Sequence, residues 1–257
     1  MALPFKLSLA TTADIPLLAR ISDSAFKQDT HTQLKAIAGK NPNPNEHIDM
    51  MTSVLSSWMS RPPERCQVVK AELDADAGES EQRAIGWACW ATATAEPASE
   101  TSTAATVPVK PAREEIGRYD GSSGTPKLEQ LSAITGKSLQ GWQEYLSPWP
   151  GSGEKCMVLV AIVIAPEYQR QGVGSALIGW GTKKADEMGV TSWVSSSDAG
   201  WRAFKGKGFE VMGELRVDLD EFAEDGSRNP DAVDGKWGMY VWRAMRRASV
   251  KEIDVRD

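Results

Sequence analysis

The strongest constraint on the fold is an apolar run that leads through a glycine turn into a helical pattern. The run Lys155–Ala165, KCMVLVAIVIA, is almost continuously apolar, which is typical of a central strand that is covered on both faces. The following segment PEYQRQGVG contains Gly172 and Gly174, and residues 173–188 have helical spacing up to a stop at Gly189. A buried strand that enters a helix in this way predicts an α/β sheet. The face of this helix toward the core is expected to carry Val173, Leu177, Trp180, Lys184 and Met188.

The glycine turn has the chemistry of an anion site. The first N–H groups of a helix have no partner inside the helix, and the helix dipole adds partial positive charge at the same end. Gly172 and Gly174 lack a Cβ, so a pyrophosphate can approach the main chain, and the guanidinium of Arg170 adds a full charge. The turn does not fit a nucleotide P-loop, because no Gly-Lys-Ser/Thr follows. It does not fit a dinucleotide-binding G-x-G-x-x-G either, because Leu177 takes the last position.

The flanking sequence predicts a single domain over 1–257, with a central mixed sheet and helices on both faces. Strands are expected at 5–10, 65–73, 83–94, 155–165, 191–197, 209–219 and 236–247, and helices at 12–26, 46–59, within 126–150, 173–188 and 198–208. The segment 27–44 is polar and leads into NPNPNE, which is expected to be a loop, and the acidic segment 74–82 is expected to be another loop. The segment 96–124 is rich in Ala, Ser, Thr, Pro and Glu and buries too little apolar surface to order itself, so it is expected to be a mobile insertion.

Composition excludes several classes of function. The formal net charge is −6 and no long basic run occurs, which argues against nucleic acid and anionic membranes and mildly favours cationic small substrates. Cys66, Cys89 and Cys156 are odd in number and lie in apolar runs, as expected of reduced thiols in a cytoplasmic protein. Only two histidines are present and no ligand spacing occurs, so no metal is expected. Neither a signal peptide nor a membrane span is indicated.

The turn and its surroundings resemble a known family. The stretch IAPEYQRQGVG is similar to the acyl-CoA signature Q-x-x-G-x-G of the GNAT superfamily of N-acetyltransferases, with Gln169, Gly172 and Gly174 at the signature positions. Three further segments are similar to that family in the same order: LSLATTADIPLLARI, AIGWACW and SSSDAGWRAFKGKGFEVMG. The resemblance covers about residues 5–26, 64–95 and 155–245.

This resemblance implies an α/β GNAT-like acyl-CoA N-acyltransferase fold and acetyl-CoA, or coenzyme A, as the co-substrate. The implied reaction is transfer of an acetyl group to a small-molecule amine by direct attack on the thioester. The backbone of 162–164 is expected to pair with the pantetheine arm as though it were an added strand. The implied cofactor-binding residues are Ile162, Val163, Ile164, Gln169, Arg170, Gln171, Gly172, Val173, Gly174, Ser175, Trp201 and Phe204.

The catalytic groups are less well indicated. The family commonly has a tyrosine that acts as the general acid, and this chain has Phe204 at the matching position. The middle of the central strand, 159–161, also has no polar side chain. The candidates are Ser197, which can assist the departing thiolate, and Glu144, which can act as a base or contact the substrate. Each has a structural alternative, since Ser197 can be a polar strand end and Glu144 can lie on a surface helix. Asp198 is expected to cap the helix that follows it. His31 and His47 lie where the family often builds its acceptor pocket, or are polar surface.

The tryptophans divide into two groups. Trp87 and Trp90 are three residues apart on one strand and are expected to face opposite sides of the sheet. Trp58, Trp142, Trp149 and Trp201 fall in segments expected to border the acceptor cleft, which would favour a flat, partly aromatic substrate.

Two alternatives to a small-molecule acetyltransferase remain open. Phe204 is compatible with a catalytically impaired acyl-CoA-binding protein of the same fold. A protein or peptide acetyltransferase would need an open groove, which the 96–124 segment could cover. The acceptor and the oligomeric state are not indicated by the sequence.

Overall fold

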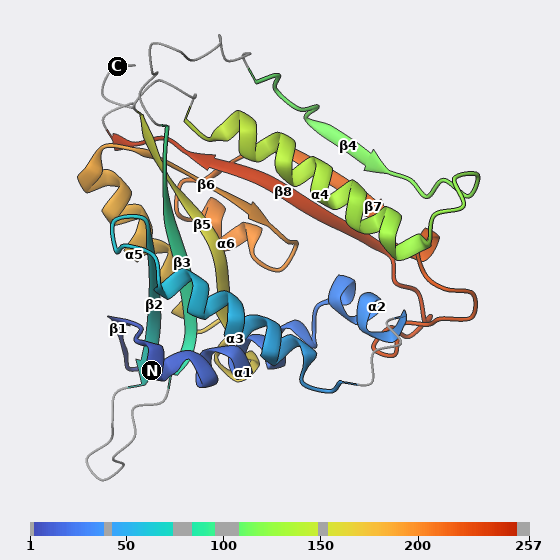
Figure 1. Cartoon of the computed structure of the whole chain (residues 1–257), viewed down its shortest axis with the longest axis horizontal. Coiled ribbons are helices and arrows are strands. Elements are labelled where there is room, and N and C mark those ends of the chain that lie inside the picture. Colours follow the sequence, from blue (N-terminus) through green and yellow to red (C-terminus); the bar gives the residue numbers. More distant parts are fainter. Residues whose placement is uncertain (1–2, 39–42, 74–83, 96–107, 149–153, 251–257) are drawn as a thin grey trace.

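A computed structural model describes residues 3–38, 43–73, 84–95, 108–148 and 154–250, and the described chain forms one mixed sheet (Figure 1). The sheet has eight strands in the order β1-β2-β3-β5-β6-β8-β7-β4. They are β1 (Phe5–Leu9), β2 (Cys66–Leu73), β3 (Ala84–Thr94), β4 (Glu114–Gly117), β5 (Lys155–Ile164), β6 (Thr191–Ser196), β7 (Glu210–Asp218) and β8 (Met239–Arg247). Neighbours are antiparallel except for the pairs β5–β6 and β4–β7. The predicted central position of β5 is confirmed.

Helices cover both faces of the sheet, as predicted (Figure 1). They are α1 (Ile15–Phe26), α2 (Thr30–Ala38), α3 (Glu46–Met59), α4 (Lys127–Leu146), α5 (Val173–Met188) and α6 (Trp201–Lys205). Two tryptophans of β3, three residues apart, mark the two faces. The indole N–H of Trp87 donates to the carbonyl of Leu18 in α1 at 3.0 Å, whereas that of Trp90 donates to the carbonyl of Leu177 in α5 at 3.3 Å. The opposite orientation predicted for these two side chains is confirmed.

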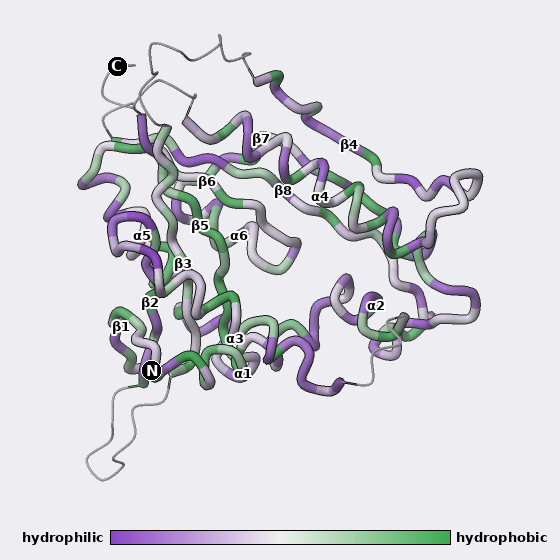
Figure 2. The backbone as a smooth tube through the Cα atoms, in the orientation of Figure 1, coloured by the Kyte–Doolittle hydropathy of each residue, from purple (hydrophilic) through white to green (hydrophobic). Residues whose placement is uncertain are grey.

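The central strands are apolar because both of their faces are covered. Figure 2 shows β5 as a hydrophobic strand and the short edge strand β4 as largely hydrophilic. All three cysteines are buried free thiols in β2, β3 and β5, as predicted for a strand-rich core. The Cys66 and Cys89 sulfur atoms lie 3.4 Å apart. Among the described helices, none is long and apolar enough to cross a membrane.

The core face of α5 differs from the predicted face. Its buried residues are Val173, Leu177, Ile178, Gly181, Thr182 and Ala185. Met188 is 38% exposed, and Lys184 also lies outside the core face, so the prediction was wrong for both. The cause is close packing against Trp90, since a Cβ on Gly181 would lie 2.0 Å from the indole atom Cε2. A small residue, rather than the large apolar ones, therefore sets the helix orientation.

Two segments for which no helix or strand was predicted contain regular structure. Helix α2 lies within the segment 27–44, where its side chain Leu34 is fully buried. Strand β4 lies within the predicted mobile insertion and pairs in parallel with β7, although its Ile116 is 64% exposed. A sheet edge recruits a strand through backbone hydrogen bonds, which do not require an apolar sequence. Helix α4 is also longer than the short helical piece expected, with 20 residues. The predicted loop at 74–82 and the first part of the insertion, 96–107, lie outside the described residues.

Candidate active site

Strand β5 carries an extra residue in its middle. Along β3, Cys89 pairs with Ala161 but the next residue, Trp90, pairs with Leu159. Val160 is therefore a β-bulge, and its side chain is 44% exposed. The bulge reverses the alternation of side chains, because Leu159 packs toward α5 whereas Ala161 packs toward α1 and α3. Such a bulge bends the strand and interrupts its ladder at one point.

Strands β5 and β6 separate at the same point. Their parallel pairing ends at Leu159 and Val194, and among the described residues no later pair continues it. From there β6 follows β8 on its other side. The range 160–164 of β5 keeps its β3 partner but presents an open edge toward β6. The side chains of Ile162 and Ile164 pack toward α5 and Val163 is buried, so in 162–164 the main chain is the part that a ligand can reach.

The turn between β5 and α5 has two left-handed residues. Arg170 has φ 59° and is the non-glycine residue with positive φ in the described chain. Gly172 has φ 89° and is the N-cap of α5. A Cβ on Gly172 would meet no atom within 4 Å, so the space in front of the helix is open. This conformation accounts for glycine at position 172.

The first N–H groups of α5 face this open space. The amide of Ala176 donates to the carbonyl of Gly172 at 3.0 Å, which starts the hydrogen-bond ladder of the helix. By helix geometry, the N–H groups of residues 173–175 precede that ladder and need an outside partner. A Cβ on Gly174 would lie 3.4 Å from Ile164 Cδ1, which is an ordinary van der Waals contact, so packing against β5 does not by itself require glycine there. The residues at this helix start fit a diphosphate.

Two glutamines of the signature brace the turn. The side-chain amide of Gln169 donates to the carbonyl of Ile164 at 3.2 Å, and that of Gln171 donates to the carbonyl of Glu167 at 2.7 Å. Both residues were predicted to bind the cofactor. Their side chains are engaged within the turn, so their effect on a ligand is to hold the main chain in place.

The structure places the side chain of Phe204 in the hydrophobic core. Its side chain is 2% exposed and packs edge-on against Phe209, with ring centroids 5.6 Å apart. This burial argues against the predicted contact of Phe204 with the cofactor. Trp201, one turn earlier in α6, is partly buried and has the guanidinium of Arg243 4.9 Å from its ring centroid. Asp198 pairs with Arg243, whereas the N-cap of α6 is Gly200, so the predicted capping role was also wrong.

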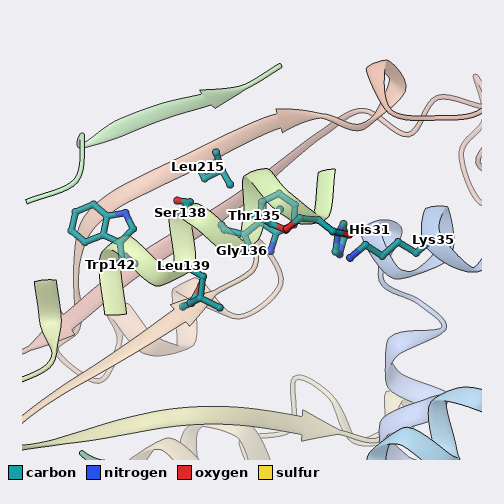
Figure 3. A pocket seen from close by; sticks show the side chains of 12 residues that line it. His31, Lys35, Thr135, Gly136, Ser138, Leu139, Trp142 and Leu215 are labelled. Carbon is teal, nitrogen blue, oxygen red and sulfur yellow. The ribbon is translucent and has the colours of Figure 1, made fainter. Parts of the chain in front are cut away.

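Figure 3 shows a cavity, which has a volume of about 250 Å³. Its strand residues Ser195 and Ala244 are the neighbours of Val194 and Met245, which pack in the α5 cluster, so the cavity lies on the opposite face of the sheet from α5. Its walls come from α2, α4 and strands β6, β7 and β8. Ser195 follows Val194, the last β6 residue paired with β5, and lines this cavity. The cavity therefore lies beside the point where β5 and β6 separate. Its lining consists of His31, Lys35, Ser132, Thr135, Gly136, Ser138, Leu139, Trp142, Ser195, Leu215, Trp242 and Ala244.

His31 is a neutral histidine on the cavity wall. Its Nε2 is buried and has no hydrogen-bond partner among the described residues. The ring stands edge-on to Trp242, with centroids 5.0 Å apart. Burial, together with the nearby charge of Lys35, lowers the pKa of His31 to about 4, although Asp29 acts in the opposite direction. The imidazole is therefore uncharged at neutral pH.

A hydrogen-bond network holds α2 against the sheet. Asp29 accepts hydrogen bonds from the amide and hydroxyl of Thr32, both at 2.8 Å, and so caps α2. Its other oxygen accepts from the phenol of Tyr240 at 2.6 Å. The Ser197 hydroxyl hydrogen-bonds the same phenol, and burial next to Asp29 raises the pKa of Tyr240. Ser197, a predicted catalytic residue, is thus tied to the network that positions His31.

Glu144, the other predicted catalytic residue, does not line the cavity. It is exposed on α4 and accepts a hydrogen bond from the Gln140 amide at 2.8 Å. The cavity residues of α4 recur at intervals of three and four, which leaves Glu144 on another face of the helix. The position of Glu144 therefore argues against its role as a base.

The remaining predicted site residues have separate outcomes. Trp142 lines the cavity, as expected for a border of the acceptor cleft. Trp58 instead packs near Trp87, with ring centroids 6.3 Å apart, and Trp149 lies outside the described residues. His47 pairs with the hydroxyl of Ser22 at 2.9 Å and joins α3 to α1.

Lys35 and Trp242 were not predicted as site residues. Two sequence signals could have pointed to the cavity elements. The first signal is the spacing Asp29-x-x-Thr32 in the polar segment 27–44. This spacing is typical of a helix start, and the two residues form the capping bonds of α2. The second signal is the small size of the residues at Ser132, Thr135 and Gly136, which leaves room beside α4. Only the large apolar and aromatic residues of this helix had been considered. Among the described residues, no cluster of His, Cys, Asp or Glu side chains is arranged to hold a metal ion.

Comparison with known proteins gives one family. The model of the acetyltransferase (GNAT) family matches residues 33–209. A protein named acetyltransferase from Stachybotrys chartarum is 26% identical over 215 residues, which are 83% of this chain and 84% of the relative.

One of the similar solved structures has a TM-score above 0.5 and shares the fold. The structure of an insect protein assigned as arylalkylamine N-acetyltransferase 7, from the yellow fever mosquito Aedes aegypti, has a TM-score of 0.53 at 10% identity, covering 94% of this chain and 87% of that chain. The phosphinothricin acetyltransferase of Sinorhizobium meliloti, in complex with acetyl-CoA, has a TM-score of 0.47 at 12% identity, covering 95% and 87% of the two chains.

Proposed function

This chain belongs to the GNAT acetyltransferase family, and we propose that, as an acetyl-CoA-dependent N-acetyltransferase, it acetylates the amine of a small molecule by direct attack. The observation that carries the proposal is the coincidence of three features at the middle of the sheet. These are the bulge at Val160, the separation of β5 from β6 after Leu159 and the cavity beside Ser195. Together they give the thioester arm a path along β5 and the acceptor a compartment in the cavity. The gap where β5 and β6 separate lies between the two.

The main chain is proposed to hold acetyl-CoA, which supplies an acetyl group activated as a thioester. The N–H groups at the start of α5 and the guanidinium of Arg170 suit the diphosphate in charge and direction. The open edge of residues 160–164 suits the amide-containing pantetheine arm, which can hydrogen-bond along it as an added strand. We propose that Trp201 contacts the cofactor at the border of this site.

The acceptor compartment favours a small molecule over a peptide. A volume of about 250 Å³ is below the range of about 300 to 1,000 Å³ usual for drug-sized ligands. The aromatic rings of Trp142 and Trp242 supply flat apolar walls. A peptide substrate would need an extended groove on the described surface, whereas this compartment is short.

The chemistry needs few groups from the chain. The amine lone pair attacks the thioester carbonyl carbon, a C–N bond forms, the C–S bond breaks and the thiolate leaves with its electron pair. One proton must leave the nitrogen, and we assign Nε2 of His31, neutral and without a partner among the described residues, to accept it. A main-chain N–H near the bulge at Val160 is proposed to polarise the carbonyl oxygen, and the hydroxyl of Ser197 to assist the thiolate.

Release of free thiol from acetyl-CoA, followed with a panel of small amines, tests the proposal. We expect turnover with at least one amine. Coenzyme A binding without thiol release for any acceptor would instead support the acyl-CoA-binding alternative that Phe204 suggested.

The two histidines supply a matched test of the proposed base. His31→Gln is expected to lower kcat by about a hundredfold while coenzyme A affinity is kept, because only proton transfer is affected. His47→Gln should leave kcat within about twofold, since His47 contacts Ser22 away from the cavity. Equal losses in both variants would show that His31 has a structural role alone.

A further inference from the structure

The charge of the cavity lining points to the class of acceptor. Among the twelve lining residues, Lys35 is a cation and none is an aspartate or glutamate. We propose that the acceptor carries a carboxylate in addition to its amine, and that Lys35 binds this carboxylate. The inference rests on the proposed function and deepens it, because it names the substrate class of the same site.

Lys35 has no counter-ion within the described part of the chain. No carboxylate there lies within 4.0 Å of its ammonium in an ion pair, and the side chain is half-buried. Burial lowers the pKa of Lys35, opposed by the charge of Asp29. A partly buried cation is costly unless it is paired. An anionic ligand group would supply the pair.

Asp29 is the carboxylate whose charge acts on Lys35, and both of its oxygens already accept hydrogen bonds. One accepts from the amide and hydroxyl of Thr32, and the other accepts from the phenol of Tyr240. These bonds hold Asp29 at the start of α2, one helical turn and a half before Lys35. The ammonium therefore remains available to the cavity.

The anion is a carboxylate because the lining offers one full charge. A phosphate monoester carries close to two negative charges at neutral pH and would leave one of them unpaired. A carboxylate matches a single ammonium, and a small cavity suits its size. A hydroxyl group such as that of Ser132 can supply its second hydrogen bond.

The ends of the cavity assign an orientation to the acceptor. Figure 3 shows His31 and Lys35 side by side at one end of the cavity and Trp142 at the other. The carboxylate then lies at the α2 end, where the amine on the adjacent carbon can reach Nε2 of His31. The acceptor side chain packs along Leu139 and Leu215. This arrangement describes an amino acid or a close analogue.

The local charge differs from that of the whole chain. A net charge of −6 mildly favoured cationic substrates when the sequence was considered alone. Exposed charges are screened over about 8 to 10 Å at physiological salt, whereas a charge on a half-buried wall acts at contact distance. Lys35 therefore decides the preference of the cavity.

Pairs of amines that differ by a carboxylate test the inference. L-phenylalanine with 2-phenylethylamine, and L-leucine with 3-methylbutylamine, are compared by calorimetric binding to the enzyme with coenzyme A present, and by thiol release from acetyl-CoA. We expect the carboxylate-bearing member of at least one pair to bind about tenfold or more tightly, as for a charge-assisted hydrogen bond. Lys35→Gln should remove this preference without weakening the carboxylate-free amine, and Lys35→Glu should reverse it.

Lys137→Gln is the matched control. Lys137 is an exposed cation on α4, next in sequence to the lining residues Gly136 and Ser138, but it does not line the cavity. Its loss should leave the preference unchanged. Equal binding within every pair, or an equal effect of the Lys35 and Lys137 variants on the preference, would overturn the inference. Thiol release from acetyl-CoA with any of these amines would still support the proposed function. A preference in binding without any thiol release would support the anion site and refute the function.

Discussion

At the scale of single residues, Gly172 connects backbone geometry to ligand binding. Its φ of 89° is accessible to glycine at little cost, and a Cβ there would enter empty space. The position is therefore constrained by conformation and by the ligand rather than by neighbouring side chains.

Gly172→Glu separates these two constraints. Left-handed strain should cost about 1 to 2 kcal/mol of folding stability. A carboxylate in front of α5 should weaken coenzyme A binding at least a hundredfold by steric and charge conflict with the diphosphate. Gly226→Glu is the control, because Gly226 has φ 82° and also has no atom within 4 Å of its Cβ position. Calorimetry showing the same affinity in both variants would rule out the turn as the diphosphate site.

His31 links the cavity to the pH dependence of stability. Its pKa is about 4 in the folded chain and near 6.5 when unfolded, so the unfolded state binds the proton first as pH falls. Stability from this residue is present above pH 6.5 and is lost between pH 6.5 and pH 4. From pH 7 to pH 5, the wild type should lose about 2 kcal/mol more than His31→Gln, measured by urea unfolding. A parallel pH dependence of the two proteins would mean that His31 is not buried as a neutral group.

At the scale of elements, close contacts between helices and the sheet fix the site. The indole of Trp90 lies against α5 at Gly181, which sets the distance of that helix from β5 and hence the position of its first turn. Sequence periodicity identified α5 and its limits but placed Lys184 and Met188 on the wrong face. Periodicity weights apolar residues and therefore misses a glycine that packs by its lack of a side chain.

Gly181→Ala tests this contact. The added methyl would lie 2.0 Å from Trp90, so overpacking should lower the free energy of unfolding by about 2 kcal/mol. Gly179→Ala on the same helix meets the flexible end of Lys207 at 3.6 Å and should be neutral or stabilise by up to about 1 kcal/mol. Chemical denaturation of the two variants measures the difference. A stable Gly181→Ala protein would contradict the packing described here.

The elements that line the cavity were the ones least accessible to sequence reasoning. Helix α2 has one fully buried apolar side chain, Leu34, and its start depends on the bonds of Asp29 to Thr32 and Tyr240. Tyr240 lies about two hundred residues away in sequence, with a separation of 211 positions from Asp29. A local pattern carries no signal for such a contact.

At the scale of the whole molecule, the sheet divides the proposed reaction between two faces. The α5 face carries the diphosphate turn, and the opposite face carries the cavity between α2 and α4 (Figure 1). The turn, β5 and α5 could be predicted because the residues that determine them, such as Gln169 and Gly172, lie close together in the sequence. The cavity could not, because α2, α4, β6, β7 and β8 meet there only after folding.

The structure of the enzyme crystallised with coenzyme A tests the central claim most directly. We predict the diphosphate within hydrogen-bond distance of the N–H groups at the start of α5, and the pantetheine arm alongside residues 160–164 with its sulfur next to the cavity at Ser195. A nucleotide bound elsewhere on the sheet, or an arm that does not follow β5, would contradict this account.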